Sequence, residues 1–137
     1  MRLLIDTHCW LWWLSSPESL NAEARKILAS RQNRVLLSAA SSWEIAIKFA
    51  LGKLKLPEPP EKYVPGRMAD QGMDSLPIEH IHALRVASLP PHHRDPFDRL
   101  LIAQAQVEKL PILTADRKLA DYGIELIWGG SGKAPRM

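Results

Sequence analysis

Four carboxylates stand where an apolar segment ends or where a helix is expected to begin, and these positions suit them for chemistry. Asp6 follows the apolar run Leu3–Ile5, and Asp116 closes the stretch "ILTAD". Glu44 lies in "SSWEIAIK" and Asp98 in "HRDPFDRL". Strand ends and helix starts of a parallel α/β fold meet at one edge of the sheet, where such folds bind their ligands. The sequence therefore predicts that the four side chains converge.

A cluster of this kind requires a positive partner. Two carboxylates about 4 Å apart repel by roughly 4 kcal/mol at an effective dielectric constant near 20, so three or four could not all stay ionised alone. Carboxylate oxygens and water are the ligands that Mg²⁺ and Mn²⁺ prefer. We expect a divalent-metal site made of the following catalytic residues: Asp6, Glu44, Asp98 and Asp116. Thr114, which precedes Asp116 by two residues on the same side of its strand, and Asp95 are expected to support it.

Each carboxylate also has a purely structural explanation. Asp6 and Asp116 could cap the helices that follow them. Ser41 and Glu44 match a capping box, and Glu44 stands four residues before Lys48, which is a favourable helical pair. Only the predicted convergence of all four favours a metal ligand over a cap at Asp6.

Asp95 and Asp98 compete for the third acidic position. Asp95 precedes Pro96, so its backbone should be extended and its side chain free to cap the helix. Asp98 caps nothing by itself, and in the first helical turn it can project toward the edge of the sheet. The positive end of the helix dipole favours its ionised form there. We therefore expect Asp98 to be the ligand and Asp95 the cap.

Expected strands and helices alternate along the chain. Strands are expected at 2–6, 34–39, 73–78, 110–116 and 124–128, and helices at 7–14, 17–31, 41–53, 78–89 and 95–109, with helical turns at 63–70 and 117–123 and a proline-rich connection at 54–66. This alternation predicts an α/β fold in which helices cover both faces of a mainly parallel sheet. We expect a single domain over residues 1–128 and a flexible C-terminal tail over residues 129–137.

Composition and length narrow the class of protein. The chain has 137 residues, of which 46% are hydrophobic, and this predicts one globular domain. No apolar run reaches the roughly 18–20 residues of a membrane span, and the start lacks the features of a signal peptide. Cys9 is the only cysteine, so an internal disulfide is excluded. We expect a cytoplasmic protein, and its net charge of +3 is compatible with a nucleic-acid partner.

Four stretches carry a resemblance to a known family. "LLIDTHCWLWWL", "SAASSWEIAIK", "HRDPFDRLLIAQA" and "ILTAD" together resemble the PIN domain, in its branch of VapC-type toxins from bacterial toxin–antitoxin pairs. The resemblance covers roughly residues 1 to 128. It implies a three-layer α/β/α fold and a Mg²⁺- or Mn²⁺-dependent ribonuclease whose acidic positions match the four named above. It also implies a cognate small antitoxin that blocks the site, and commonly a homodimer.

Residues around the motifs suggest further roles. Arg94, Arg99, Arg117 and Lys118 are candidates for contacts with RNA phosphates, with ordinary surface charge as the alternative. The histidines His8, His92 and His93 invite an acid role or a transition-metal site, but a catalytic role is not favoured for them, and the adjacent His92 and His93 do not share a helix face.

The tryptophans also have two explanations. Trp10, Trp12, Trp13 and Trp43 could stack on RNA bases, although packing is favoured. The helix at 7–14 and the prolines Pro57, Pro59 and Pro60 are expected to offer an apolar groove to an amphipathic antitoxin segment. The alternative function is a non-catalytic RNA-binding or protein-interaction module with the same fold, against which the full acidic set argues.

Overall fold

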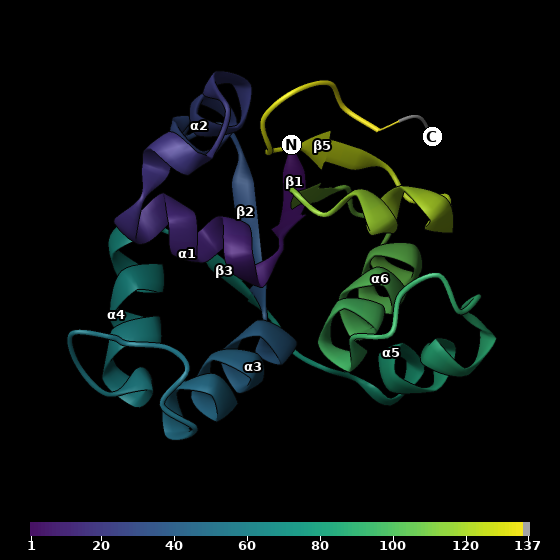
Figure 1. The fold of residues 1–137 in the computed structure, drawn as a ribbon, viewed down its shortest axis with the longest axis horizontal. Coiled ribbons are helices and arrows are strands. Elements are labelled where there is room, and N and C mark those ends of the chain that lie inside the picture. The colour runs from purple at the N-terminus through teal and green to yellow at the C-terminus, as the bar shows by residue number, and fades with distance from the viewer. Residues whose placement is uncertain (136–137) are drawn as a thin grey trace.

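The computed structural model describes residues 1–135; residues 136 and 137, at the end of the expected tail, lie outside the described residues. One sheet of five parallel strands runs through the middle of the molecule in the order β3-β2-β1-β4-β5 (Figure 1). The strands are β1 (Arg2–Ile5), β2 (Arg34–Ser38), β3 (Asp74–Leu76), β4 (Ile112–Thr114) and β5 (Leu126–Trp128). The predicted parallel α/β architecture is confirmed.

Helices cover the two faces of this sheet. They are α1 (Thr7–Ser15), α2 (Ala22–Ala29), α3 (Ala39–Ala50), α4 (Pro60–Gln71), α5 (His80–Arg85) and α6 (Pro96–Glu108), with the short 3₁₀ helices η1 (Pro17–Ser19), η2 (Val86–Ser88) and η3 (Arg117–Tyr122). In Figure 1, α1, α2 and α4 lie on one side of the strands, and α5 and α6 lie on the other. Among the described residues, no helix has the length and apolar character needed to cross a membrane.

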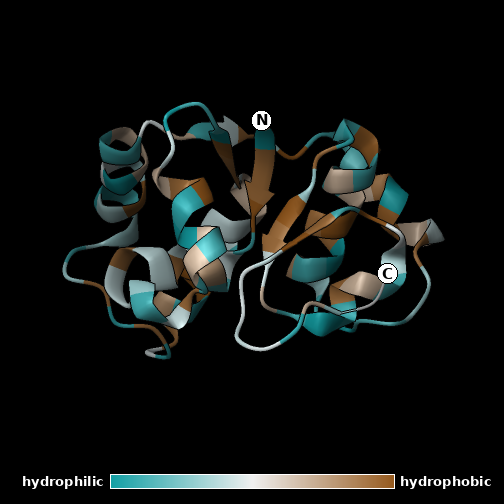
Figure 2. Ribbon diagram, turned by 90° about the horizontal axis from the view of Figure 1, so that it is seen from above, coloured by the Kyte–Doolittle hydropathy of each residue, from teal (hydrophilic) through white to brown (hydrophobic). Residues whose placement is uncertain are grey.

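Alternating strand residues build a separate hydrophobic core on each face. Leu3 and Ile5 of β1 point into one core, with Trp10 of α1, whereas Leu4 points into the other, with Leu101 of α6. Successive strand side chains face opposite ways, so a strand buried on both faces must be apolar throughout. Figure 2 shows this pattern, with mostly hydrophobic strands between helices of mixed character.

Several helix boundaries differ from those predicted. The helix expected over residues 17–31 is broken into η1 and α2, because the side chain of Asn21 accepts a hydrogen bond from the Ala24 N–H at 2.8 Å and caps a new helix. The proline-rich connection ends early, since α4 begins at Pro60. A proline is tolerated at the first position of a helix because that residue needs no N–H donor.

The start of the expected tail contacts the domain. The Gly129 N–H donates to the Thr114 carbonyl at 2.8 Å, and the Asn21 N–H donates to the Gly129 carbonyl at 2.9 Å. The Asn21 side-chain amide also donates to the Gly130 carbonyl. The backbone at residues 129 and 130 is therefore tied to β4 and to the cap of α2, while the domain boundary at residue 128 stays a prediction.

The N-terminus of α6 has the cap expected from the sequence. Asp95 has extended backbone, and its Oδ1 accepts hydrogen bonds from the N–H groups of Phe97 (2.8 Å) and Asp98 (3.2 Å). Pro96 occupies the first helical position, and Asp98 lies in the first turn. Asp95 thus fixes the start of α6, the helix that carries Asp98.

We predict that Asp95→Ala lowers the free energy of unfolding by about 0.5–2 kcal/mol, because two N–H groups lose their acceptor. Asp95→Asn should change it little, since asparagine caps nearly as well. Urea unfolding of both variants measures the difference. Asp121→Ala, which removes an exposed aspartate from η3, is the control. Equal losses for Asp95→Ala and Asp121→Ala would contradict the assigned cap.

Candidate active site

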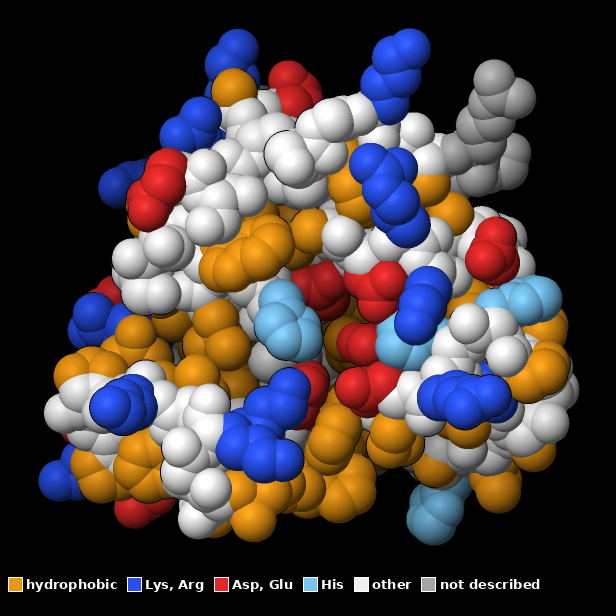
Figure 3. Space-filling model, viewed as in Figure 1, with side chains coloured by type: hydrophobic (Ala, Val, Ile, Leu, Met, Phe, Trp, Pro, Cys, Tyr) orange, Lys and Arg blue, Asp and Glu red, His pale blue; other side chains and the backbone are white. Residues whose placement is uncertain are grey.

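Acidic side chains from four separate elements meet at the carboxyl edge of the sheet. Asp6 directly follows β1, Asp116 follows β4, Glu44 lies in α3 and Asp98 lies in the first turn of α6. The negative charges of the other three, together with that of Asp95, all act on Asp98. Figure 3 shows acidic side chains gathered in a hollow near the middle of this face, with histidine and basic side chains around it.

Asp6 both caps a helix and forms a wall of the site. Its Oδ1 accepts a hydrogen bond from the Cys9 N–H at 2.7 Å, so it is the N-cap of α1. Its Oδ2 accepts a short hydrogen bond from the Thr114 hydroxyl, whose oxygen in turn accepts from the Asp116 N–H at 3.0 Å. Thr114 is fully buried and links the two aspartates. The cap and the site are therefore compatible roles at Asp6.

Glu44 does not form the capping box expected with Ser41. Helix α3 begins three residues earlier than that box requires, and its N-cap is Ser38, whose Oγ accepts from the Ala40 N–H at 3.0 Å. Ser41 instead accepts a hydrogen bond from the Thr7 hydroxyl at 2.8 Å. The strand runs directly into the helix, so the first available serine becomes the cap.

The carboxylate of Glu44 is buried and only half satisfied. Its side chain is 2% exposed, and its Oε2 accepts from the Lys48 ammonium at 2.7 Å, the predicted helical pair. Its other oxygen, Oε1, is buried with no hydrogen-bond partner among the described residues. An unsatisfied buried oxygen of this kind is costly, and a bound cation would satisfy it.

Electrostatics also favour a cation in this site. The pKa of Asp98 is raised from its ordinary value of 3.8 to about 8, mainly by burial and then by the negative charges of Asp95, Asp6, Glu44 and Asp116. Burial raises the pKa of Asp6 too, although its hydrogen bonds act in the opposite direction. Hard oxygen donors that repel one another when ionised fit a divalent cation. The donor set therefore suits a metal ion.

His93 is the site residue that sequence reasoning undervalued. Its Nε2 lies 2.7 Å from Asp116 Oδ2 and 3.2 Å from Asp98 Oδ2, and its side chain is buried. Its neighbour His92 is exposed and packs edge-on against the Tyr122 ring. The position of His93 in the sequence was the one indication of this role. His93 stands two residues before Asp95, the cap of the helix that carries Asp98.

The predicted basic residues divide into two groups. The guanidinium of Arg99 donates to the backbone carbonyls of Pro90, His93, Val86 and Leu89, so it fixes the loop before α6 and is not a surface cation. The remaining candidates are exposed: Arg94, Arg117 and Lys118. Among these, the Arg117 guanidinium stacks 4.7 Å from the Trp128 ring centre.

Most of the tryptophans pack inside the protein, as favoured above. Trp10 is fully buried, and its indole N–H donates to the Gln71 side chain at 3.0 Å. Trp12 and Trp13 pack against the same core. Trp43, next to Glu44, is 57% exposed and contacts the Phe97 ring edge-on at 5.0 Å.

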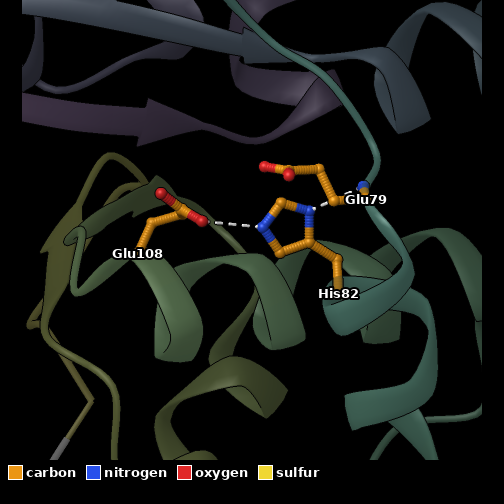
Figure 4. A group of neighbouring side chains, drawn as sticks. All are labelled: Glu79, His82 and Glu108. Atoms are coloured by element: carbon orange, nitrogen blue, oxygen red, sulfur yellow. Dashed lines mark hydrogen bonds and ion pairs between the residues drawn. The ribbon is translucent and has the colours of Figure 1, made fainter.

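A second acidic group with a histidine lies between α5 and α6 (Figure 4). His82 is fully buried, and its Nδ1 accepts a hydrogen bond from the Glu79 N–H at 3.0 Å. The neutral ring therefore carries its proton on Nε2, which lies 2.8 Å from Glu108 Oε2 and donates to it. Nδ1 thus caps α5 and Nε2 joins α5 to α6, which leaves neither ring nitrogen for a metal.

Comparison with known proteins agrees with this fold. The family model of the PIN domain matches residues 3–125, and the chain belongs to that family. Over 60 residues, which are 44% of this chain and 43% of the relative, it is 52% identical to Ribonuclease VapC16 of Mycobacterium tuberculosis (strain ATCC 25618 / H37Rv). The aligned part thus spans less than half of that relative.

Solved structures share the architecture. VapBC2 from Rickettsia felis, bound to a DNA fragment from the promoter, matches 94% of this chain and 99% of its own at a TM-score of 0.71 and 14% identity. DNA-bound VapBC from Salmonella typhimurium matches 93% and 97% at a TM-score of 0.67 and 15% identity. At sequence identities this low, the similarity to these structures shows a shared fold and nothing more.

The raised pKa of Asp98 leads to a prediction about stability. The folded state keeps the proton up to about pH 8, whereas the unfolded chain loses it near pH 3.8, so folding stability falls as pH rises between these values. In EDTA at pH 8, Asp98→Asn should therefore be more stable than the wild type by at least about 1 kcal/mol, since one pKa unit corresponds to roughly 1.4 kcal/mol.

Urea unfolding at pH 4 and pH 8 measures this effect. The gain of Asp98→Asn should shrink toward zero at pH 4, where the wild-type carboxyl is protonated in the folded state. Asp121→Asn, at an exposed position, is the control and should show no such pH dependence. A variant less stable than the wild type at pH 8 would contradict the repulsion that we assign to Asp98.

Proposed function

We propose that this protein is a divalent-metal-dependent ribonuclease that acts as the toxin of a toxin–antitoxin pair, with Mg²⁺ as the metal and Mn²⁺ as a substitute. The observation that carries the proposal is the convergence of buried, mutually repelling carboxylates at one edge of a PIN-domain sheet, with Oε1 of Glu44 unsatisfied. The partial match to a relative named Ribonuclease VapC16 supports the activity. The likeness in fold to VapBC complexes supports the toxin role.

In this proposal, the carboxylates of Asp6, Glu44 and Asp98 hold the ion, and Asp116 positions a water molecule or holds a second ion. A bound divalent cation supplies a Lewis acid that lowers the pKa of water and neutralises charge that develops on phosphorus. Thr114 keeps Asp6 and Asp116 in register through its hydroxyl.

Basic side chains would support a metal ligand or attract the substrate. Lys48 neutralises Oε2 of Glu44, and Oε1, which has no partner among the described residues, would take the cation. Arg94 and Lys118 are exposed beside the acidic motifs, where they attract RNA phosphates.

The first test of this function is metal-dependent cleavage. Purified protein should cut RNA with Mg²⁺ or Mn²⁺ and stop when EDTA is added. Asp6→Asn should reduce cleavage by more than about 100-fold, because loss of a residue that merely supports a metal ligand already costs about 10–100-fold. The fold should survive, since the asparagine oxygen can still accept from the Cys9 N–H.

The matched control is Asp121→Asn, which makes the same change at an exposed position. Thermal melts establish that each variant is folded. Full cleavage by folded Asp6→Asn would remove Asp6 from the metal site, and cleavage that persists in EDTA would refute the metal dependence.

For the partner, we propose a cognate small antitoxin that places an amphipathic segment between α3 and α4. The groove there is lined by apolar and proline residues: Ala46, Phe49, Ala50, Pro59, Pro60, Val64 and Pro65. Of the prolines expected to offer this surface, Pro59 and Pro60 line the groove and Pro57 does not. The side chains of Trp10, Trp12 and Trp13 of α1 pack into the protein. Because α3 also carries Glu44, an occupant of the groove can extend a basic side chain to the acidic site.

A homodimer is part of the same proposal. Ile81 and Leu84 of α5 lie three residues apart and are 58% and 73% exposed, and Ile78 just before the helix is exposed as well. Large apolar side chains gathered in this way favour contact with another protein surface.

We predict that Ala46→Glu weakens binding of the antitoxin by at least about tenfold, because burial of an unpaired charge costs several kcal/mol and 1.4 kcal/mol is tenfold in affinity. Ala46 is exposed, so the variant should fold. The probe is the small protein encoded immediately upstream, measured by its affinity and by its rescue of growth on co-expression. Ala22→Glu, at an exposed position on α2, is the control. Equal binding by both variants would exclude this groove.

A further inference from the structure

His93 lies between two of the acidic side chains, although it comes from the loop before α6. Its Nε2 is 2.7 Å from Oδ2 of Asp116 and 3.2 Å from Oδ2 of Asp98. The two carboxylates are close enough to each other that one ring nitrogen reaches both. Without a donor between them, two carboxylates at such a distance repel.

The orientation of the ring determines which nitrogen carries the proton. Nδ1 of His93 lies 3.1 Å from the backbone nitrogen of Asp95, which has a hydrogen to donate, so Nδ1 is the acceptor. In a neutral imidazole the other nitrogen is then the N–H donor. The Nε2–H group therefore donates to Oδ2 of Asp116, and the same nitrogen lies 3.2 Å from Oδ2 of Asp98.

The protein fixes the backbone that carries this ring. The backbone N–H of His93 donates to the Tyr122 hydroxyl at 2.7 Å, and that hydroxyl donates to the Pro90 carbonyl at 2.9 Å. The carbonyl of His93 accepts from the Arg99 guanidinium at 3.2 Å. The side chain is also buried. The ring is thus held in place before any ligand arrives.

We propose that His93 is a positioning residue of the metal centre, whose Nε2–H holds Asp98 and Asp116 together in the arrangement that binds the ion. This inference rests on the proposed function, because it assigns the carboxylates to a metal. The side chain of Asp95 is sufficient to cap α6, and Nδ1 of His93 is sufficient to accept the hydrogen of the Asp95 N–H. Neither structural contact uses Nε2 of His93. The contacts of Nε2 with Asp116 and Asp98 are therefore additional to what the cap of α6 requires.

Metal binding to the whole chain, stripped with EDTA, tests this role without reference to catalysis. Mn²⁺ is titrated into the wild type, His93→Phe and His93→Gln by calorimetry. His93→Phe keeps a similar volume but removes the donor, so we expect Mn²⁺ to bind about 10–100-fold more weakly. His93→Gln keeps an N–H donor on its amide and should recover a substantial part of that loss.

The exposed neighbour provides matched controls. His92→Phe and His92→Gln make the same changes one residue earlier and should leave Mn²⁺ affinity unchanged. Thermal melts without metal report any loss of fold. Nitrogen-15 NMR of the wild-type imidazoles adds a measurement that needs no variant, and it should find His93 in the Nε2–H tautomer.

The outcomes separate this inference from the proposed function. If the wild type binds Mn²⁺ and folded His93→Phe binds it equally well, the positioning role is wrong while the metal site stands. Equal losses in the Phe and Gln variants, in proportion to their loss of thermal stability, would also overturn the role, as would an Nδ1–H tautomer. If the wild type binds no Mn²⁺, the proposed function fails and this inference fails with it.

Discussion

Repulsion between buried carboxylates is the constraint that shapes this molecule. Asp6 and Glu44 are almost fully buried, and Asp98 lies close enough to both to feel their charges. A chain that places so much negative charge in one hollow must supply donors to hold it. The Cys9 N–H and Thr114 hydroxyl do so for Asp6, and Lys48 does so for Glu44. His93 serves the remaining two carboxylates.

The protein can tolerate such a site because the stability of the fold comes from other parts of the molecule. The strands are buried on both faces, and each face has its own hydrophobic core. All five strands are parallel, so their carboxyl ends and the starts of the helices after them meet at one edge. Helix N-termini there offer N–H groups and positive dipole ends to carboxylates. Aspartates at such positions can therefore cap a helix and line the site at once, as Asp6 and Asp116 do.

Local sequence patterns predicted the strands, the parallel sheet and the meeting of the acidic side chains, because these follow from apolar runs and from topology. They failed where a choice between neighbours depended on tertiary structure. Ser38 and Ser41 are both good caps, and the end of β2 selects Ser38. His92 and His93 are identical in type and adjacent, and only the course of their loop separates an exposed ring from a buried one.

That loop course is determined by contacts distant in sequence. Arg99 binds carbonyls along the loop and the Tyr122 hydroxyl accepts from the His93 N–H, so residues that come later in the chain decide where the ring points. No periodicity encodes such contacts.

Repulsion between the carboxylates explains why a cation stabilises this hollow whatever the source of the cation. A metal ion, or a basic side chain from a partner, relieves the same repulsion at the same oxygens, so the two should compete for one place.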